Sequence, residues 1–125
     1  MRFELSQRFF FEAAHTLRRD QASDRAGTSR RIHGHTYRAK VSVAGEPDAH
    51  TGMVVDLARL RAAIDTVREQ LDHQLLDDVP GLGAATLENL CGFIHRALVS
   101  AGWRVASVEV KRDATGDSCR LVGDA

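Results

Sequence analysis

Two segments near the N-terminus alternate apolar and polar residues. Residues 2–14 and 36–44 have this two-residue period, which is typical of half-buried β-strands. Their apolar positions include Phe3, Leu5, Phe9, Phe11, Tyr37, Ala39, Val41 and Val43. The segment between them, residues 16–31, is polar and rich in turn formers. We therefore expect two strands joined by a long loop.

Two later segments carry apolar residues at helical spacing. Residues 57–71 follow Asp56, a good N-cap, and a second helix is expected between Thr86 and Gly102. The apolar positions are Leu57, Leu60, Ile64, Val67, Leu71, Leu87, Leu90, Cys91, Ile94 and Leu98. The stretch DDVPGLG separates the two helices.

Two short strands are expected near 104–112 and 118–122. The order is then ββααββ, which predicts an α+β fold with one antiparallel sheet and two helices over one face. A length of 125 residues suits a single domain over residues 1–125. The open sheet has two exposed edges, so we expect the chain to cover them by oligomerisation.

Composition narrows the class of protein. The formal net charge is zero, which argues against binding to nucleic acid or an anionic membrane. No apolar run approaches the length of a membrane span, and the two cysteines form no CxxC pair. A cytoplasmic enzyme or binding protein is expected. Fifteen of the seventeen basic residues are arginine, and five of them lie within residues 18–31. That cluster is either a solvated loop or a clamp for an anionic substrate.

Two histidines flank a glycine just before the second alternating segment. His33 and His35 are two residues apart, so on a strand they point to the same face. The pair alone is a weak signal, because such spacing also arises by coincidence. His15, at the end of the first strand, would lie near the pair if the two strands form a hairpin. Three imidazoles without a carboxylate or thiolate fit an open zinc site with one position left for water or substrate.

Five motifs, in order along nearly the whole chain, resemble the 6-pyruvoyltetrahydropterin synthase and 6-carboxytetrahydropterin synthase family. They are FFFEAAH (9–15), RIHGHTY (31–37), DAHTGMVVDL (48–57), LDHQLLDD (71–78) and ATLENL (85–90). The resemblance implies the tunnelling fold, in which subunits join their sheets into a barrel as a trimer or hexamer.

The same resemblance implies a zinc lyase acting on 7,8-dihydroneopterin triphosphate. Zinc would be held by His15, His33 and His35. Compact bacterial members release triphosphate and a two-carbon aldehyde, which leaves a 6-carboxy pterin for deazaguanine (queuosine-type) synthesis. Animal-type members release triphosphate alone and leave a pyruvoyl chain.

Further roles follow from the resemblance. Asp72 and His73 match the family's acid–base dyad; from the residues alone, they are also an ordinary polar cluster at a helix end. Glu88 matches a pterin-anchoring glutamate, and Thr86 in the same segment is expected to bind substrate. Glu88 is equally well explained as an acidic residue in the first turn of a helix, and one residue can do both.

Two positions depart from the family pattern. The family's cysteine is Ser29 here, a much poorer base than a thiol, or simply a loop serine. Family members also have a carboxylate late in the chain. The corresponding position here is Arg112, and Asp113 follows one residue later. A β-bulge would turn Asp113 toward the substrate; without it, Arg112 would face the pocket, which would not suit a pterin.

Three functions therefore stay open. The first is a lyase of the 6-carboxytetrahydropterin type. The second is a paralogue with a different side-chain cleavage that gives a 6-pyruvoyl or 6-hydroxymethyl pterin. The third is a zinc-loaded oligomer that binds a pterin or purine without turning it over.

Overall fold

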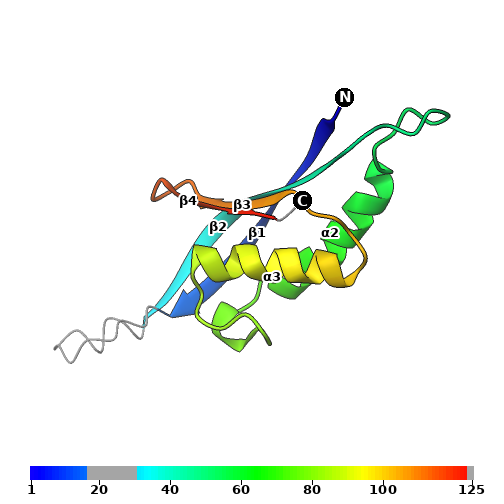
Figure 1. The fold of residues 1–125 in the computed structure, drawn as a ribbon. Coiled ribbons are helices and arrows are strands. Elements are labelled where there is room, and N and C mark those ends of the chain that lie inside the picture. The colour runs from blue at the N-terminus through cyan, green and yellow to red at the C-terminus, as the bar shows by residue number, and fades with distance from the viewer. Residues whose placement is uncertain (17–30, 124–125) are drawn as a thin grey trace.

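The computed structural model describes residues 1–16 and 31–123, which form one four-stranded antiparallel sheet in the order β1-β2-β3-β4. Helices α2 and α3 lie on one side of this sheet (Figure 1). The expected ββααββ order is confirmed. The elements are β1 (Phe3–Thr16), β2 (Ile32–Gly45), α2 (Leu57–Leu71), the 3-10 helix η1 (Leu76–Asp78), α3 (Leu87–Ser100), β3 (Ser107–Arg112) and β4 (Asp117–Val122).

Strands β1 and β2 form the longest pairing and position the histidines. They pair continuously from Phe3 opposite Gly45 to Thr16 opposite Ile32. Strand β2 therefore begins at Ile32, before the expected start at residue 36. The glycine and histidines of this stretch have no strong strand pattern of their own, but pairing with the end of β1 satisfies their backbone groups. Both candidate histidines of β2 consequently lie inside a strand.

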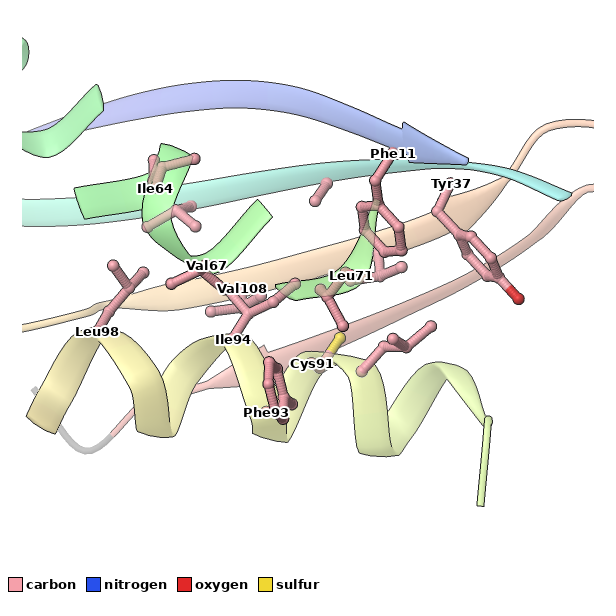
Figure 2. Close-up of a cluster of buried hydrophobic side chains, with 14 of the residues drawn as sticks. Phe11, Tyr37, Ile64, Val67, Leu71, Cys91, Phe93, Ile94, Leu98 and Val108 are labelled. Atoms are coloured by element: carbon pink, nitrogen blue, oxygen red, sulfur yellow. The ribbon is translucent and has the colours of Figure 1, made fainter. Parts of the chain in front are cut away.

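Each helix begins at the residue that the sequence predicts. The Asp56 carboxylate accepts a hydrogen bond from the Ala58 backbone N–H at 2.9 Å, and the Thr86 hydroxyl accepts one from the Asn89 N–H at 3.1 Å. The apolar stripes of both helices pack on the inner face of the sheet, as Figure 2 shows. The fully buried side chains include Phe11, Tyr37, Val41, Leu60, Leu71, Leu90, Ile94, Leu98, Val108 and Val110. Burial of this core is the main source of the fold's stability.

The chain after α2 runs beside the outer edge of β1. His73 has a φ of 59°, and its backbone N–H donates to the Glu12 carbonyl at 2.6 Å. The Ala14 N–H donates to the Gln74 carbonyl at 3.0 Å, and Ala14 forms a parallel bridge with Leu75. These bonds cover the edge of β1 at its C-terminal end and fix residues 72–75 next to the histidines. Within one chain the sheet is open, so the barrel stays a prediction.

None of the described helices is long and apolar enough to cross a membrane.

Candidate functional site

The three candidate histidines gather at one end of the β1–β2 pair. His15 on β1 lies directly opposite His33 on β2, and His35 lies opposite Ala13. The ring centroids of His15 and His35 are 5.1 Å apart, and those of His15 and His33 are 6.4 Å apart. The structure thus brings together His15, His33 and His35, which we call the histidine cluster.

Two ring nitrogens of this cluster are buried without a partner among the described residues, and a hydrogen bond orients one of the rings. His15 Nδ1 lies 3.0 Å from the Thr16 carbonyl oxygen, so Nδ1 carries the proton and Nε2 is left as an acceptor. The Nε2 atoms of His15 and His33 are buried and have no hydrogen-bond partner among the described residues. Burial, followed by the nearby His15 and Arg112 side chains, lowers the pKa of His35. Neutral imidazoles are the form that binds metal ions.

The cluster fits a metal by its chemistry and its backbone positions. Side chains directly opposite each other on paired strands have Cβ atoms about 4.5–5.5 Å apart, so rotation of the rings can bring their nitrogens onto one point. In the present arrangement, no three His, Cys, Asp or Glu side chains of residues 1–16 and 31–123 are placed to hold one ion. Zinc binding is therefore supported by proximity and by the buried ring nitrogens, and coordination itself stays a prediction.

Asp72 and His73 form a hydrogen-bonded pair beside the cluster. His73 Nδ1 lies 2.9 Å from Asp72 Oδ2. Asp72 Oδ1 accepts the Glu12 backbone N–H at 2.9 Å, and Oδ2 lies 3.2 Å from Nη2 of Arg68. The Glu12 N–H is the main cause of a lowered pKa for the Asp72 carboxyl, and His73 and Arg68 act in the same direction. The carboxylate is thus held ionised and fixes the His73 ring.

His73 is reachable from outside. Its side chain is 75% exposed, whereas that of Asp72 is 14% exposed. His73 and His35 line one hollow of about 510 Å³, together with Gly34 and Thr36. Among the described residues, this hollow contacts the histidine cluster through His35 and not through His15 or His33.

A larger cavity of about 800 Å³ begins at His15 and runs along the N-terminus of α3. Thr86 and Glu88, which the family resemblance marks as substrate-binding residues, both line it, and their binding role stays a prediction. Asp77 shapes its wall, because its carboxylate accepts both the backbone N–H of Thr16, at 2.9 Å, and the Thr16 hydroxyl. The cavity lining within the described chain is His15, Thr16, Asp77, residues 83–88, Arg112 and Asp117.

Of the two arrangements left open at Asp113, the structure has the one without a β-bulge. Strands β3 and β4 pair without interruption from Ser107 opposite Val122 to Arg112 opposite Asp117. Asp113 lies in the turn that follows, 59% exposed, and its carboxylate pairs with Arg38. The one-residue offset seen in the sequence is absorbed by this turn, where Gly116 takes a φ of 74°. Arg112, not Asp113, therefore lines the cavity.

Asp117 is a site residue that sequence reasoning missed. It begins β4, faces Arg112 across the hairpin and lines the cavity with it. The length of the turn could have indicated it. A turn of four residues between Arg112 and Asp117 makes these two residues neighbours on the paired strands. Ser29 and four of the arginines of residues 18–31 lie outside the described residues.

Comparison with known proteins agrees with this architecture. Residues 4–120 match the family described as 6-pyruvoyl tetrahydropterin synthase. The chain is 39% identical over 113 residues to a 6-carboxy-5,6,7,8-tetrahydropterin synthase of Synechocystis, which covers 86% of this chain and 84% of that protein. It is 35% identical over 102 residues to human 6-pyruvoyl tetrahydrobiopterin synthase, covering 73% and 70% of the two chains.

A solved structure extends the likeness to the fold. The 6-pyruvoyl tetrahydropterin synthase of Caenorhabditis elegans superposes with a TM-score of 0.84 and 26% identity, over 99% of this chain and 97% of that one. The match includes both strands of the histidine cluster and the helix that carries Thr86 and Glu88. This chain belongs to the 6-pyruvoyl tetrahydropterin synthase family, whose named members are pterin synthases of the lyase type.

Proposed function

We propose that this protein is a zinc-dependent lyase that converts 7,8-dihydroneopterin triphosphate to a 6-carboxytetrahydropterin. The observation that supports the proposal is that the histidine cluster reaches two hollows: His15 lines the cavity of Glu88, and His35 lines the hollow of His73. The name of the Synechocystis relative supports the choice of product.

His15, His33 and His35 would hold the zinc through their ring nitrogens. When bound, zinc would polarise side-chain oxygens of the substrate and stabilise the enolate-like charge that forms when a carbon-bound proton leaves. The hydrogen bond from His15 Nδ1 to the Thr16 carbonyl holds one ring in the tautomer that this requires.

Proton transfer would fall to His73. Its Nδ1 is engaged with Asp72, so Nε2 is the atom left to exchange a proton with the substrate side chain. Asp72 remains ionised because its pKa is lowered, and its charge stabilises the imidazolium that forms. His73 needs its unusual backbone conformation to reach this position, since the residue sits at the point where the chain leaves α2 and joins the edge of β1.

Glu88 and Thr86 would bind the substrate in the larger cavity. A carboxylate at the Glu88 position can accept hydrogen bonds from the amino group of a pterin ring. The Thr86 hydroxyl already accepts the Asn89 N–H at the start of α3, so it would contact the substrate while it also caps the helix.

We also propose a trimer or hexamer as the working unit, a cytoplasmic location and a place in deazaguanine synthesis.

The alternative is a paralogue that cleaves the same side chain differently, to a 6-pyruvoyl or a 6-hydroxymethyl pterin. The observation that favours it is Ser29 at the family's cysteine position. Arg112 in the cavity instead counts against a pterin as the ligand. A binding protein that does not turn the pterin over would share the same cavity and would differ only in the outcome of the assay.

Incubation with 7,8-dihydroneopterin triphosphate and zinc, followed by mass analysis, tests the proposal. We expect 6-carboxytetrahydropterin, acetaldehyde and triphosphate from the unaltered protein, formed about 10²–10⁴-fold more slowly by His73→Ala. His50→Ala is the matched control, because His50 is an exposed histidine outside the histidine cluster. A different pterin product would establish the paralogue, and unchanged substrate that nevertheless binds would establish the binding protein.

A further inference from the structure

Asp77 extends the contacts along the edge of β1 by one further residue. The last backbone bond between this edge and residues 72–75 runs from the Ala14 N–H to the Gln74 carbonyl, at 3.0 Å. The chain then turns into η1, and a side chain takes over. Oδ1 of Asp77 accepts the Thr16 N–H at 2.9 Å, and Oδ2 accepts the Thr16 hydroxyl. Thr16 is therefore held by one carboxylate through both its backbone and its side chain.

Thr16 in turn orients the first histidine of the cluster. Its carbonyl oxygen lies 3.0 Å from Nδ1 of His15, and a carbonyl can only accept, so the contact selects the tautomer with its proton on Nδ1. Nε2 of His15 is then the acceptor, and it is buried without a hydrogen-bond partner among the described residues. The direction of this nitrogen consequently depends on where the Thr16 carbonyl is held.

These contacts lie where water competes weakly with them. His15 is 5% exposed, and its bond to the Thr16 carbonyl and the bonds of Thr16 to Asp77 are all partly buried. A carboxylate that accepts two hydrogen bonds fixes its partner more firmly than a neutral acceptor does. The next acid, Asp78, is exposed and makes no hydrogen bond to Thr16 within the part of the chain that the structure describes.

We propose that Asp77 is a positioning residue for the metal ligand His15. It acts through Thr16: the carboxylate fixes the Thr16 peptide, the carbonyl of Thr16 fixes the imidazole, and the imidazole presents Nε2 to a metal ion. The inference rests on the proposed function for the identity of the metal. The tautomer of His15, however, is a property of the protein without metal and can be measured separately.

A direct contact between Asp77 and the substrate is the rival explanation, because Asp77 also lines the larger cavity. Both of its oxygens are already bonded to Thr16, so the positioning role uses contacts that the structure contains. The two roles differ in what they predict. A positioning residue changes the affinity for metal in the absence of substrate, whereas a substrate ligand leaves that affinity unchanged.

Zinc affinity, measured by competition with a chromophoric chelator, tests the role without turnover. Partners that orient a ligating histidine typically change metal affinity by about 10–100-fold, and we expect the lower end for Asp77→Ala, because one residue intervenes. Thr16→Val removes one of the two bonds and should weaken zinc binding less, whereas Thr16→Ser keeps the hydroxyl and should bind zinc normally. In the Asp77→Ala background, Thr16→Val should have no further effect. Asp78→Ala is the matched control.

The tautomer of His15 gives a second measurement that needs no metal. The ¹⁵N chemical shifts of the imidazole nitrogens, assigned with His15→Ala, distinguish a ring protonated on Nδ1 from one protonated on Nε2. We expect only the Nδ1–H form of His15 in the unaltered metal-free protein and a mixture of both forms in Asp77→Ala. Asp78→Ala should give the spectrum of the unaltered protein.

The outcomes separate this inference from the proposed function. If Asp77→Ala keeps both the zinc affinity and the Nδ1–H tautomer, the inference is refuted while the zinc site stands. If it keeps both and instead weakens binding of neopterin, Asp77 is a substrate ligand and the inference is wrong. If the unaltered protein binds no zinc, the proposed function and the inference fail together. Should Asp77→Ala fail to fold, the comparison of Thr16→Val with Thr16→Ser decides: equal zinc affinities refute the inference.

Discussion

Replacing Asp72 by alanine should destabilise the protein in a pH-dependent way. The carboxylate accepts the Glu12 backbone N–H at 2.9 Å and faces Arg68 and His73. A hydrogen bond to a charged group contributes about 1.5–3 kcal/mol. The side chains of Arg68 and His73 are 33% and 75% exposed, so solvent screens their interactions, which contribute at most about 1 kcal/mol. The Glu12 bond dominates, and we expect Asp72→Ala to lower the free energy of unfolding by about 2–3 kcal/mol at pH 7.

The sign of the pH dependence follows from the lowered pKa of Asp72. A carboxyl group whose pKa is lower in the folded state stabilises the fold at pH values above its ordinary value of 3.8. This stabilisation is lost as the pH falls through the folded-state pKa. The difference in the free energy of unfolding between the unaltered protein and Asp72→Ala should therefore be constant near neutrality and should shrink below about pH 4.

Urea unfolding, followed by the fluorescence of Trp103, measures the effect. Trp103 is the single tryptophan and packs against the core, so its emission reports on loss of tertiary structure. The protein concentration must be held constant, because an oligomer's stability depends on it. Asp65→Ala is the matched control, since Asp65 is an exposed acid on the same helix. The reasoning is refuted if Asp72→Ala and Asp65→Ala destabilise the protein equally at pH 7. It is also refuted if the destabilisation by Asp72→Ala does not become smaller in acid.

Three other predictions concern function. Elemental analysis should find one zinc per chain, and His15→Ala should lose it while His50→Ala retains it; a zinc-free protein after purification with zinc present would contradict the cluster's role. Light scattering should report a trimer or hexamer, and a monomer at micromolar concentration would count against both the exposed edges and the family's assembly. His73→Ala should lower turnover by about 10²–10⁴-fold, whereas Ser29→Cys should raise proton removal from the pterin side chain, because a thiol ionises near neutral pH and a serine hydroxyl does not. If Ser29→Cys changes nothing while His73→Ala abolishes turnover, Ser29 is not part of the machinery.

The fold could be predicted because local and global signals agree. Alternation along β1 and β2 and the apolar stripes of α2 and α3 follow directly from which faces are buried. The start of β2 was missed for the opposite reason. Residues 32–35 contain little that favours a strand, and they are extended because β1 offers them hydrogen-bonding partners. The sequence of residues 32–35 alone therefore does not indicate this pairing with β1.

Some positions of the candidate site are marked by the type of residue, such as histidine. Others depend on how strands β3 and β4 pair, and the sequence alone does not give that pairing. The three histidines lie near one another at one end of β1, as the expected hairpin predicts. Asp72 and His73 were singled out by the family resemblance, and their roles stay predictions. The choice between Arg112 and Asp113 stayed open because one additional residue can be absorbed by a strand or by a turn, and the sequence does not distinguish the two. Asp117 was missed because an acid after a turn has the appearance of an ordinary solvated residue until its partner across the hairpin is known.

The pairing of residues 72–75 with β1 makes the two halves of the site one cooperative unit. Glu12 uses its N–H to hold the Asp72 side chain and its carbonyl to hold the His73 backbone, and His15 lies three residues further along the same strand. Fraying of the end of β1 would therefore displace the proton shuttle and the histidine cluster in a single opening event. Amide hydrogens of Ala14 and His73 should then exchange with solvent at the same rate, and a substitution that only loosens this strand end can inactivate the site without touching any of its functional side chains.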